Sequence, residues 1–423
     1  MRRFSLCLVA LLLMTMVSLP AAAEFKAAAA VRNVNPDPLL PVTGGTGGTT
    51  PAEKQVGDLT VRALVMEQDG VRVAIVAADF LGFPKALGDT ARAQVKGIPP
   101  ENILIGVTHC HSAPDCYGFV NEDGTCAADL KYLDLVCAKM AEAINEAVEK
   151  LQPASVKIAT DEAKGKIAYN YYAPKLYDPR MNVVQCLATD GKPIATLINY
   201  ASHPEIIGPD QGMLSPDFCG PLYDRVQAKG GGIGIYMNSA QGGMVTADCR
   251  DPNDLYNGKD IQTWQECIRI GELMADEALR IAAGATAKEN PPMMVAASTL
   301  ELPVDSDLMR MILKSSPLNY NKGDQTKVKT QLNVINLAGA QMLTIPGEAL
   351  PNIGYYLKRK MHGDSNFLFG LTNDAFGYIL TKEDWMSFAR YKYVSETSLG
   401  ELTGDLYIEQ ALKFVDSLPR PVK

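Results

Sequence analysis

Apolar residues recur at intervals of three and four over several long segments of the chain, a spacing that predicts amphipathic helices. The longest pattern covers residues 133–151 and is carried by Leu135, Ala138, Met140, Ile144, Val148 and Leu151. Similar patterns predict helices at residues 217–229, 264–283, 349–361 and 399–418. The first of these four should end at the glycines 230–232, because glycine readily adopts the left-handed conformation that ends a helix.

Short runs of apolar and β-branched residues predict strands between these helices. Residues 59–66 and 71–78 are joined by Gln68-Asp69-Gly70, and Asp-Gly between two apolar runs indicates a hairpin. Further strands are predicted at residues 102–107, 156–159, 182–187, 194–200, 233–237, 293–302, 331–345 and 367–371. Residues 27–51 are rich in Ala, Gly, Pro and Thr, and we expect an irregular surface segment there.

The order of these elements indicates the fold class. Strands and helices alternate along the chain with no linker, repeat or break in composition. This alternation predicts one large α/β domain, with a mixed β-sheet flanked by helices. In such folds ligands bind where strands end, so we expect the functional site at strand ends.

The N-terminus has the three parts of a secretory signal. Arg2-Arg3 is basic, residues 4–19 are apolar, and Ala21-Ala22-Ala23 supplies small residues for cleavage before Glu24. We therefore expect residues 1–23 to be a Sec-type signal peptide and residues 24–423 to be the mature chain, located in the periplasm or secreted. No later segment stays apolar for the roughly 20 residues that a membrane span needs, so we expect no transmembrane segment in the mature chain.

Composition excludes several classes of protein. The chain has 423 residues, of which 47% are hydrophobic and 21% charged, which is unlike disordered, collagen-like or polytopic membrane proteins. The net charge is −8, and no basic run is longer than Lys358-Arg359-Lys360, which argues against nucleic-acid binding. Of the nine cysteines, Cys116 and Cys126 flank a polar loop that a disulfide could close, while the others could be free thiols. The sequence does not indicate which oligomeric state the chain adopts.

Histidine is scarce, and its positions are informative. Of four histidines, His109, His111 and His203 lie where predicted strands end, whereas His362 follows a helix in a polar context and should be at the surface. Alternate residues of a strand share a face, so His109 and His111 should point the same way. Neutral imidazole is a common zinc ligand. The alternative is that these histidines only form hydrogen bonds with loop backbone.

Two turns offer further chemistry. Glu348, in Pro346-Gly347-Glu348, could complete a His/His/Glu ligand set or could simply begin a helix. The Gly-rich turn at residues 238–246 could bring backbone N–H groups close to an oxyanion, or could be only a tight turn. Its sequence lacks the order of a nucleotide-binding P-loop.

In combination these segments resemble the N-terminal catalytic domain of the neutral, non-lysosomal ceramidase family. The matching stretches follow the family's order from about Val31 to Gly404, and they are THCHSAP (108–114), SHPE (202–205) followed by LSPDFCGP (214–221), AQGGMVTAD (240–248), TIPGE (344–348) and LTNDAFGYILTKEDW (371–385). The resemblance implies that residues 24–423 form the catalytic domain of a hydrolase that cleaves the amide of ceramide.

The resemblance also implies a site. One zinc ion per chain would be bound by His109, His203, Glu348 and Tyr378. His111 would face the substrate and handle protons or the oxyanion. A tyrosine on the substrate side would be Tyr393, although Tyr391 also fits this position.

Several positions depart from the family pattern. The family turn reads close to G-D-x-S-P-N with a catalytic serine, whereas this chain has Gly243-Met244 and, in place of the serine, Thr246. Thr246 could be a nucleophile or could donate a hydrogen bond while metal-activated water attacks, and we favour the second. The family's Asn-Arg pair is Asn170-Tyr171 here, so an arginine that anchors the substrate is missing. We expect no C-terminal immunoglobulin-like domain.

Three hypotheses follow. The first is a secreted zinc hydrolase that cleaves the amide bond of N-acyl sphingoid lipids, so that the partner is a small-molecule or lipid substrate. The second is a zinc amidase or esterase for a different, more polar acyl substrate. The third is a metal-containing binding protein without catalytic activity.

Overall fold

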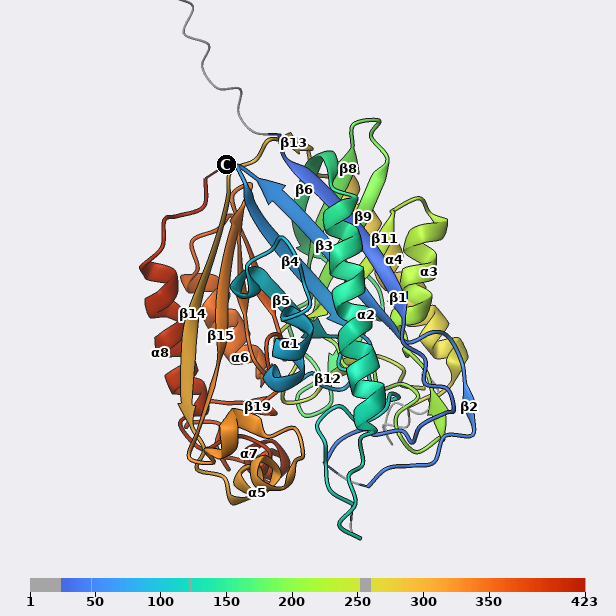
Figure 1. The fold of residues 1–423 in the computed structure, drawn as a ribbon, viewed down its shortest axis with the longest axis vertical. Coiled ribbons are helices and arrows are strands. Elements are labelled where there is room, and N and C mark those ends of the chain that lie inside the picture. Colours follow the sequence, from blue (N-terminus) through green and yellow to red (C-terminus); the bar gives the residue numbers. More distant parts are fainter. Residues whose placement is uncertain (1–23, 47, 122, 252–259, 423) are drawn as a thin grey trace, which may run out of the picture.

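Two β-sheets lie face to face, and helices cover the outer face of each, in the computed structural model of the chain (Figure 1). The structure describes residues 24–422 except 47, 122 and 252–259, so the predicted signal peptide lies outside it. The resulting order of layers is helix, sheet, sheet, helix. This arrangement confirms the predicted α/β class with a mixed sheet flanked by helices.

The larger sheet has nine strands in the order β11-β9-β8-β6-β1-β3-β4-β5, with β13 beside β6. Their bounds are β1 Lys26–Asn33, β3 Thr60–Gln68, β4 Val71–Ala78, β5 Ile103–Val107, β6 Gln152–Glu162, β8 Arg180–Ala188, β9 Pro193–Tyr200, β11 Ile233–Asn238 and β13 Lys288–Glu289. The pairs β4–β5 and β9–β11 are parallel and the others antiparallel. Twist accumulates from strand to strand, and the sheet curls until its edge strands β5 and β11 come into contact.

The smaller sheet has the order β14-β15-β16-β18, in which only β16 and β18 are parallel. Its strands are β14 Met293–Pro303, β15 Lys327–Leu337, β16 Ala340–Thr344 and β18 Ser365–Phe369. Apolar side chains from both sheets, among them Leu64, Ile75, Leu197, Ile335 and Phe367, form the core between them. Three short pairs complete the strands: β2 Lys54–Gln55 with β10 Met213–Leu214, β7 Ala168–Asn170 with β12 Val245–Ala247, and β17 Glu348–Ala349 with β19 Tyr378–Ile379.

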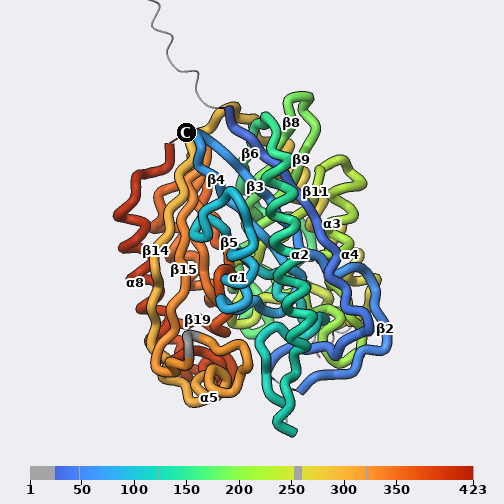
Figure 2. Tube along the Cα trace, in the orientation of Figure 1, coloured from blue at the N-terminus to red at the C-terminus, as the bar shows by residue number. Residues whose placement is uncertain are grey.

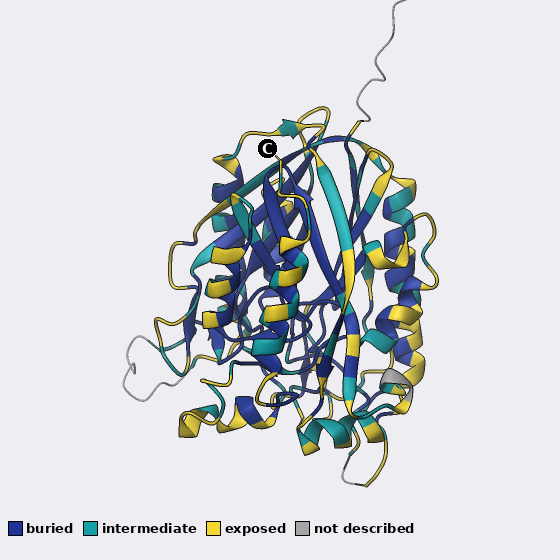
Figure 3. Ribbon diagram, turned by 90° about the vertical axis from the view of Figure 1, so that its left-hand side faces the viewer, coloured by how far each residue is buried: buried dark blue, intermediate teal, exposed yellow. Residues whose placement is uncertain are grey.

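Helices cover the outer faces with apolar sides toward the strands and exposed sides toward solvent (Figure 3). The larger sheet is covered by α1 Lys85–Arg92, α2 Leu130–Glu149, α3 Cys219–Ala228 and α4 Trp264–Ala283, and the smaller by α6 Pro351–Lys360 and α8 Thr403–Asp416. The short helices α5 Asp307–Ser315 and α7 Lys392–Glu396 lie together at one end (Figure 1). Among the described residues, no helix is long and apolar enough to cross a membrane.

The first strand corrects the expectation for residues 27–51. Residues Lys26–Asn33 form β1, which lies between β3 and β6 in the interior of the larger sheet (Figure 2). Ala27, Ala28 and Ala30 are at most 2% exposed. Their small side chains allow α2 to lie close on one face and the second sheet on the other. Alanine is uncommon in strands, so composition alone indicated a loop.

Two other expectations change in detail. Residues 331–345 were expected as one strand, but Ala338 and Gly339, both with positive φ, form a turn between β15 and β16. The thiols of Cys116 and Cys126 are free, so no disulfide closes their loop. The predicted hairpin is confirmed: Asp69 and Gly70 have φ values of 52° and 78°, as a two-residue turn of the favoured type requires.

Candidate active site

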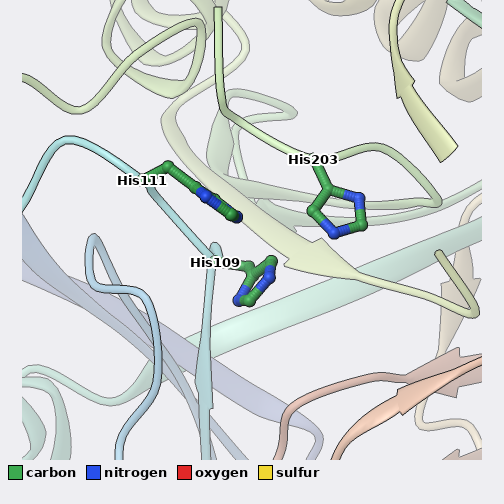
Figure 4. A group of neighbouring side chains, drawn as sticks. All are labelled: His109, His111 and His203. Carbon is green, nitrogen blue, oxygen red and sulfur yellow. The ribbon is translucent and has the colours of Figure 1, made fainter. Parts of the chain in front are cut away.

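Three histidine rings from two parts of the chain meet at one end of the larger sheet (Figure 4). His109 and His111 follow β5, and His203 follows β9. Ring centroids are 4.7 Å apart for His109 and His111, and 4.9 Å apart for His109 and His203. One ring nitrogen of each histidine lies within 4.8 Å of the others, so this largely buried group could hold a metal ion.

His109 and His111 were expected to point the same way because they would share one face of a strand, but the structure brings their rings together differently. β5 ends at Val107, so His109 and His111 lie beyond the strand and not on one of its faces. His109 has a φ of 67°, a left-handed conformation that a residue other than glycine adopts only at some cost. This turn directs the His109 ring across the strand end, where it meets the His111 ring edge to face at 88°.

Hydrogen bonds to the backbone fix which nitrogen of each ring faces the centre. His109 Nδ1 lies 2.5 Å from the Leu81 carbonyl oxygen, and His203 Nδ1 lies 2.6 Å from that of Val245. A carbonyl only accepts, so each Nδ1 carries the proton and donates it. In the neutral rings Nε2 therefore presents its lone pair, the arrangement typical of metal-binding histidines.

Glu348 faces both of these nitrogens. Its Oε2 atom lies 3.0 Å from His203 Nε2 and 3.3 Å from His109 Nε2. Glu348 begins β17, and the turn after β11 reaches it because Gly242 has no side chain: a Cβ there would lie 2.3 Å from the Glu348 carbonyl oxygen. Three segments that are distant in the sequence thus bring the Nε2 atoms of His109 and His203 close to one carboxylate oxygen of Glu348.

The donor set fits a zinc ion. Two imidazole nitrogens and a carboxylate oxygen are usual zinc ligands, and tetrahedral ligands about 2.0–2.1 Å from zinc lie roughly 3.3 Å from one another. Two lone pairs directed at one carboxylate oxygen repel it unless a cation or a proton lies between them. Burial opposes a proton on His203, but the nearby carboxylates Glu205 and Glu348 raise the pKa of His203 to about 9. Burial opposes the ionisation of Glu348, but His109 and then His203 hold the pKa of Glu348 below its usual range.

Tyr378 lies beside this set. It is the strand partner of Glu348 in the β17–β19 pair, and it is 4% exposed. Its hydroxyl lies 3.1 Å from the sulfur of Met244. Burial and the charge of Glu348 raise the pKa of Tyr378 well above its usual value. The structure therefore brings the fourth predicted ligand to the edge of the site, with its hydroxyl directed at Met244.

His111 occupies a different environment from the other two histidines. Its Nδ1 lies 4.0 Å from Glu205 Oε2, and its buried Nε2 has no hydrogen-bond partner among the described residues. Burial, followed by the charge of His109, lowers the pKa of His111 to about 3, so the ring is neutral at neutral pH. His362, by contrast, pairs with Asp416 far along the chain, away from this group, and is partly exposed as expected.

A cavity opens above the histidines. It has a volume of about 810 Å³ including open space at its mouth, and His109, His111, Glu348, Tyr378 and Tyr393 are among its lining residues. The rest of its lining is mostly apolar and includes Leu81, Phe119, Met309, Ile312, Leu313 and Phe376. Burial raises the pKa of Tyr393 to about 12, so its hydroxyl stays protonated. Tyr391 does not line this cavity.

Thr246 lies on the other side of Met244. It belongs to β12, forms a bridge with His203, and lines a neighbouring pocket together with Glu205, Met244 and Asp260. This pocket has a volume of about 690 Å³ including open space at its mouth. Thr246 is therefore close to the histidines through the backbone, but it does not line the apolar cavity.

Glu205 is a residue that the sequence reasoning missed. Burial opposes its ionisation, but the charges of His203 and His111 and a hydrogen bond from Thr246 lower its pKa. It therefore connects His111 with Thr246. The signal was present in the stretch Ser-His-Pro-Glu, which places a carboxylate two residues after a predicted ligand.

Comparisons with solved structures identify proteins that share the fold of this chain. The structure of neutral ceramidase from Pseudomonas aeruginosa matches with a TM-score of 0.72 at 13% identity, over 95% of this chain and 76% of that one. A ceramidase complexed with C2 matches with a TM-score of 0.67 at 14% identity, over 95% of this chain and 77% of that one. No protein-family model and no curated sequence matches. The chain therefore has the fold of neutral ceramidase, with a buried histidine group that could hold a metal ion.

Proposed function

We propose that this chain is a zinc-dependent hydrolase that cleaves the amide bond of N-acyl sphingoid lipids outside the cytoplasm. The observation that carries the proposal is that Glu348 Oε2 lies 3.0 Å from His203 Nε2 and 3.3 Å from His109 Nε2, where His109 and Glu348 line a mostly apolar cavity. A donor set of this kind below an apolar cavity is typical of a hydrolase for a substrate with an apolar chain.

His109, His203 and Glu348 would hold the metal, and Tyr378 would become the fourth ligand when its hydroxyl turns away from Met244. A bound zinc ion would polarise the scissile carbonyl and acidify a water molecule. Since the Nδ1 atoms of both histidines are held by backbone carbonyls, the ligand nitrogens are oriented before any ion arrives.

His111 would move the proton in this proposal. Its ring is neutral, and its Nε2 has no partner among the described residues while the ring lines the cavity. It can take a proton from the attacking water and return it to the leaving nitrogen, as a general acid–base does. Glu205, 4.0 Å from Nδ1, would favour the protonated ring during this transfer.

The cavity walls supply substrate binding. The apolar side chains of α5 and of the segment around Phe119 would take up an acyl chain, whose burial is favourable. Tyr393 keeps its proton and can donate a hydrogen bond to a polar group near the scissile bond. Thr246, whose hydroxyl is engaged by Glu205, would assist with a hydrogen bond and not as the nucleophile.

The second candidate is a zinc amidase or esterase for a more polar acyl substrate. The neighbouring pocket favours it, because Glu205 and Asp260 give that pocket an acidic lining. Tyr171, which also lines it, stands where the ceramidase family would have an arginine. A third outcome, a binding protein with a structural metal, would combine stoichiometric zinc with no turnover.

One experiment separates these candidates. Metal content is measured on purified protein, and hydrolysis is measured on ceramides, short N-acyl amino alcohols and acyl esters. The lipid proposal predicts one zinc per chain and higher kcat/KM for long than for short N-acyl chains. Preference for short polar amides or esters would support the second candidate, and zinc without any hydrolysis the third.

A further inference from the structure

Exposed apolar side chains lie on, or next to, the segments that line the apolar cavity. Five large ones belong to these segments or are joined to them by ring contacts, and we call them the mouth patch: Tyr171, Met311, Met386, Phe388 and Leu402, which are 46–67% exposed. Single exposed apolar residues are ordinary on a protein surface, but a group of them around a binding site marks an interaction surface.

The elements that carry the mouth patch also build the cavity. On α5, Met309, Ile312 and Leu313 line the cavity, while Met311 on the same helix is 58% exposed. On the other side, Tyr393 of α7 lines the cavity, and α7 is joined to the start of α5 by a hydrogen bond from Ser306 Oγ to the Glu396 carbonyl. The two helices lie side by side at one end of the molecule (Figure 1).

Ring contacts join the aromatic members of the patch into a continuous row. Phe388 contacts Tyr391 at 5.5 Å between ring centroids, Tyr391 contacts Tyr172 at 5.7 Å, and Tyr172 contacts Tyr171 at 6.0 Å. Phe388 itself is 67% exposed. The two aromatic members of the patch, Phe388 and Tyr171, are thus linked through the partly buried rings of Tyr391 and Tyr172.

Charge around the patch indicates the kind of partner. The segments 305–315 and 381–402 carry five basic side chains, Arg310, Lys314, Lys382, Arg390 and Lys392, and six acidic ones. Anionic membranes are recognised by clusters of four to eight basic residues without such compensation. The whole chain also carries a net charge of −8, which anionic lipids would repel.

We infer that the mouth patch docks on the surface of a zwitterionic lipid bilayer, so that the cavity opens directly toward the acyl chains of the lipid. Phe, Tyr, Met and Leu side chains enter the boundary between head groups and acyl chains at low cost, and the affinity then depends on the apolar area that is buried. This inference rests on the proposed lipid substrate, but binding to the bilayer does not require turnover.

The test is co-sedimentation of the full chain with vesicles of phosphatidylcholine, without any hydrolysable lipid. The variants are Met311→Gln, Phe388→Gln and the double variant, and the matched control is Val422→Gln. Val422 is 63% exposed and lies next to the C-terminus, which Figure 1 marks at the opposite end from α5 and α7. We expect the double variant to bind vesicles about tenfold less well than the parent, each single variant to bind less well, and the control to bind as the parent does.

Hydrolysis of a short, water-soluble acyl substrate tests the proposed function separately from docking on the bilayer. Turnover equal to that of the parent shows that a variant is folded, and loss of vesicle binding with normal turnover supports docking. If no short or long substrate is cleaved but vesicle binding follows the patch, the proposed function fails and docking stands. Equal vesicle binding by all variants, binding only to phosphatidylserine vesicles, or a dimer in sedimentation velocity that the double variant dissociates would overturn the inference.

Discussion

The Tyr378 hydroxyl lies 3.1 Å from the Met244 sulfur, on the boundary between the apolar cavity and the acidic pocket. A thioether is a weak acceptor, so this contact holds the hydroxyl only loosely. The ceramidase family has an acid at the position of Met244, and a carboxylate there would hold the same hydroxyl firmly. The methionine therefore leaves Tyr378 free to turn toward Glu348, its neighbour in the strand pair.

Substitutions at these two residues should have different effects on metal binding. We expect Tyr378→Phe to lower zinc affinity at least about tenfold, since it removes a ligand oxygen. Met244→Leu should leave zinc affinity unchanged, because leucine keeps an apolar side chain of similar size in the pocket wall. Titration against a competing chelator measures both. Equal zinc affinity in Tyr378→Phe and the parent would remove Tyr378 from the ligand set.

His203 should be required for metal binding. His203→Ala removes a nitrogen that lies 3.0 Å from Glu348 and leaves that buried carboxylate without its nearest partner, so zinc should be lost from the purified protein. His362→Ala is the matched control, because His362 pairs only with Asp416 and should keep one equivalent. Elemental analysis decides the matter, and a full equivalent of zinc in His203→Ala would exclude the proposed ligand set.

His111 should be required for turnover but not for metal binding. Its ring belongs to the histidine group, yet it lies against Glu205 and not against Glu348. We expect His111→Ala to lower kcat by about 10²–10⁴-fold, the usual effect of losing a positioned acid–base group, with zinc retained. Loss of zinc together with activity would show that His111 is a ligand and that one of the other histidines moves the proton.

Much of this architecture was predictable because apolar periodicity reports burial directly. The helix at residues 264–283 was predicted with the bounds of α4, and the hairpin of β3 and β4 was predicted from Asp69-Gly70. Strand ends also correctly indicated where His109 and His203 would meet. In these places local pattern and tertiary packing favour the same structure.

The remainder depends on contacts between distant segments. β1 is a strand because α2 and the second sheet need small alanines between them, which residues 26–33 do not reveal on their own. α5, with apolar residues on both its cavity side and its outer side, was not predicted. Glu205 has importance only because the fold places His111 and Thr246 beside it.

Asp374 should make stability depend on pH. Burial raises its pKa to about 7, although the backbone N–H groups of Lys85 and Ala375 donate to the carboxylate and oppose this shift. The folded chain therefore keeps a proton between about pH 4 and 7 that the unfolded chain releases. This contribution to stability is complete below pH 4 and is lost as the pH rises through 7.

Asp374→Asn should remove this contribution. The amide stays uncharged, so the free energy of unfolding of the variant should rise relative to the parent by up to about 4 kcal/mol between pH 4 and pH 7, at about 1.4 kcal/mol for each pKa unit. Urea unfolding of both proteins at several pH values measures the difference, in which the other titrating groups cancel. A difference that does not change with pH would show that Asp374 titrates normally.

Thr246 bears on how the proposed amide substrate would be attacked. Its hydroxyl is engaged by Glu205 and lines the acidic pocket, whereas His111 and Glu348 line the apolar cavity. As a β-branched residue it has a restricted χ1, so its hydroxyl can be directed in few ways. Attack by water needs no such placement, and we therefore expect Thr246 to donate a hydrogen bond without forming a covalent acyl intermediate.

Two variants separate these routes. Thr246→Val keeps the shape and removes the hydroxyl, and we expect turnover to fall about 10–100-fold, which corresponds to one hydrogen bond of about 1–3 kcal/mol. Thr246→Ser keeps the hydroxyl and frees its rotation, so turnover should be unchanged or slightly higher. Steady-state kinetics on the best substrate, together with mass spectrometry of protein quenched during turnover, test both expectations. An acyl group found on Thr246, or complete loss of turnover in Thr246→Val with zinc still bound, would establish Thr246 as the nucleophile in place of water.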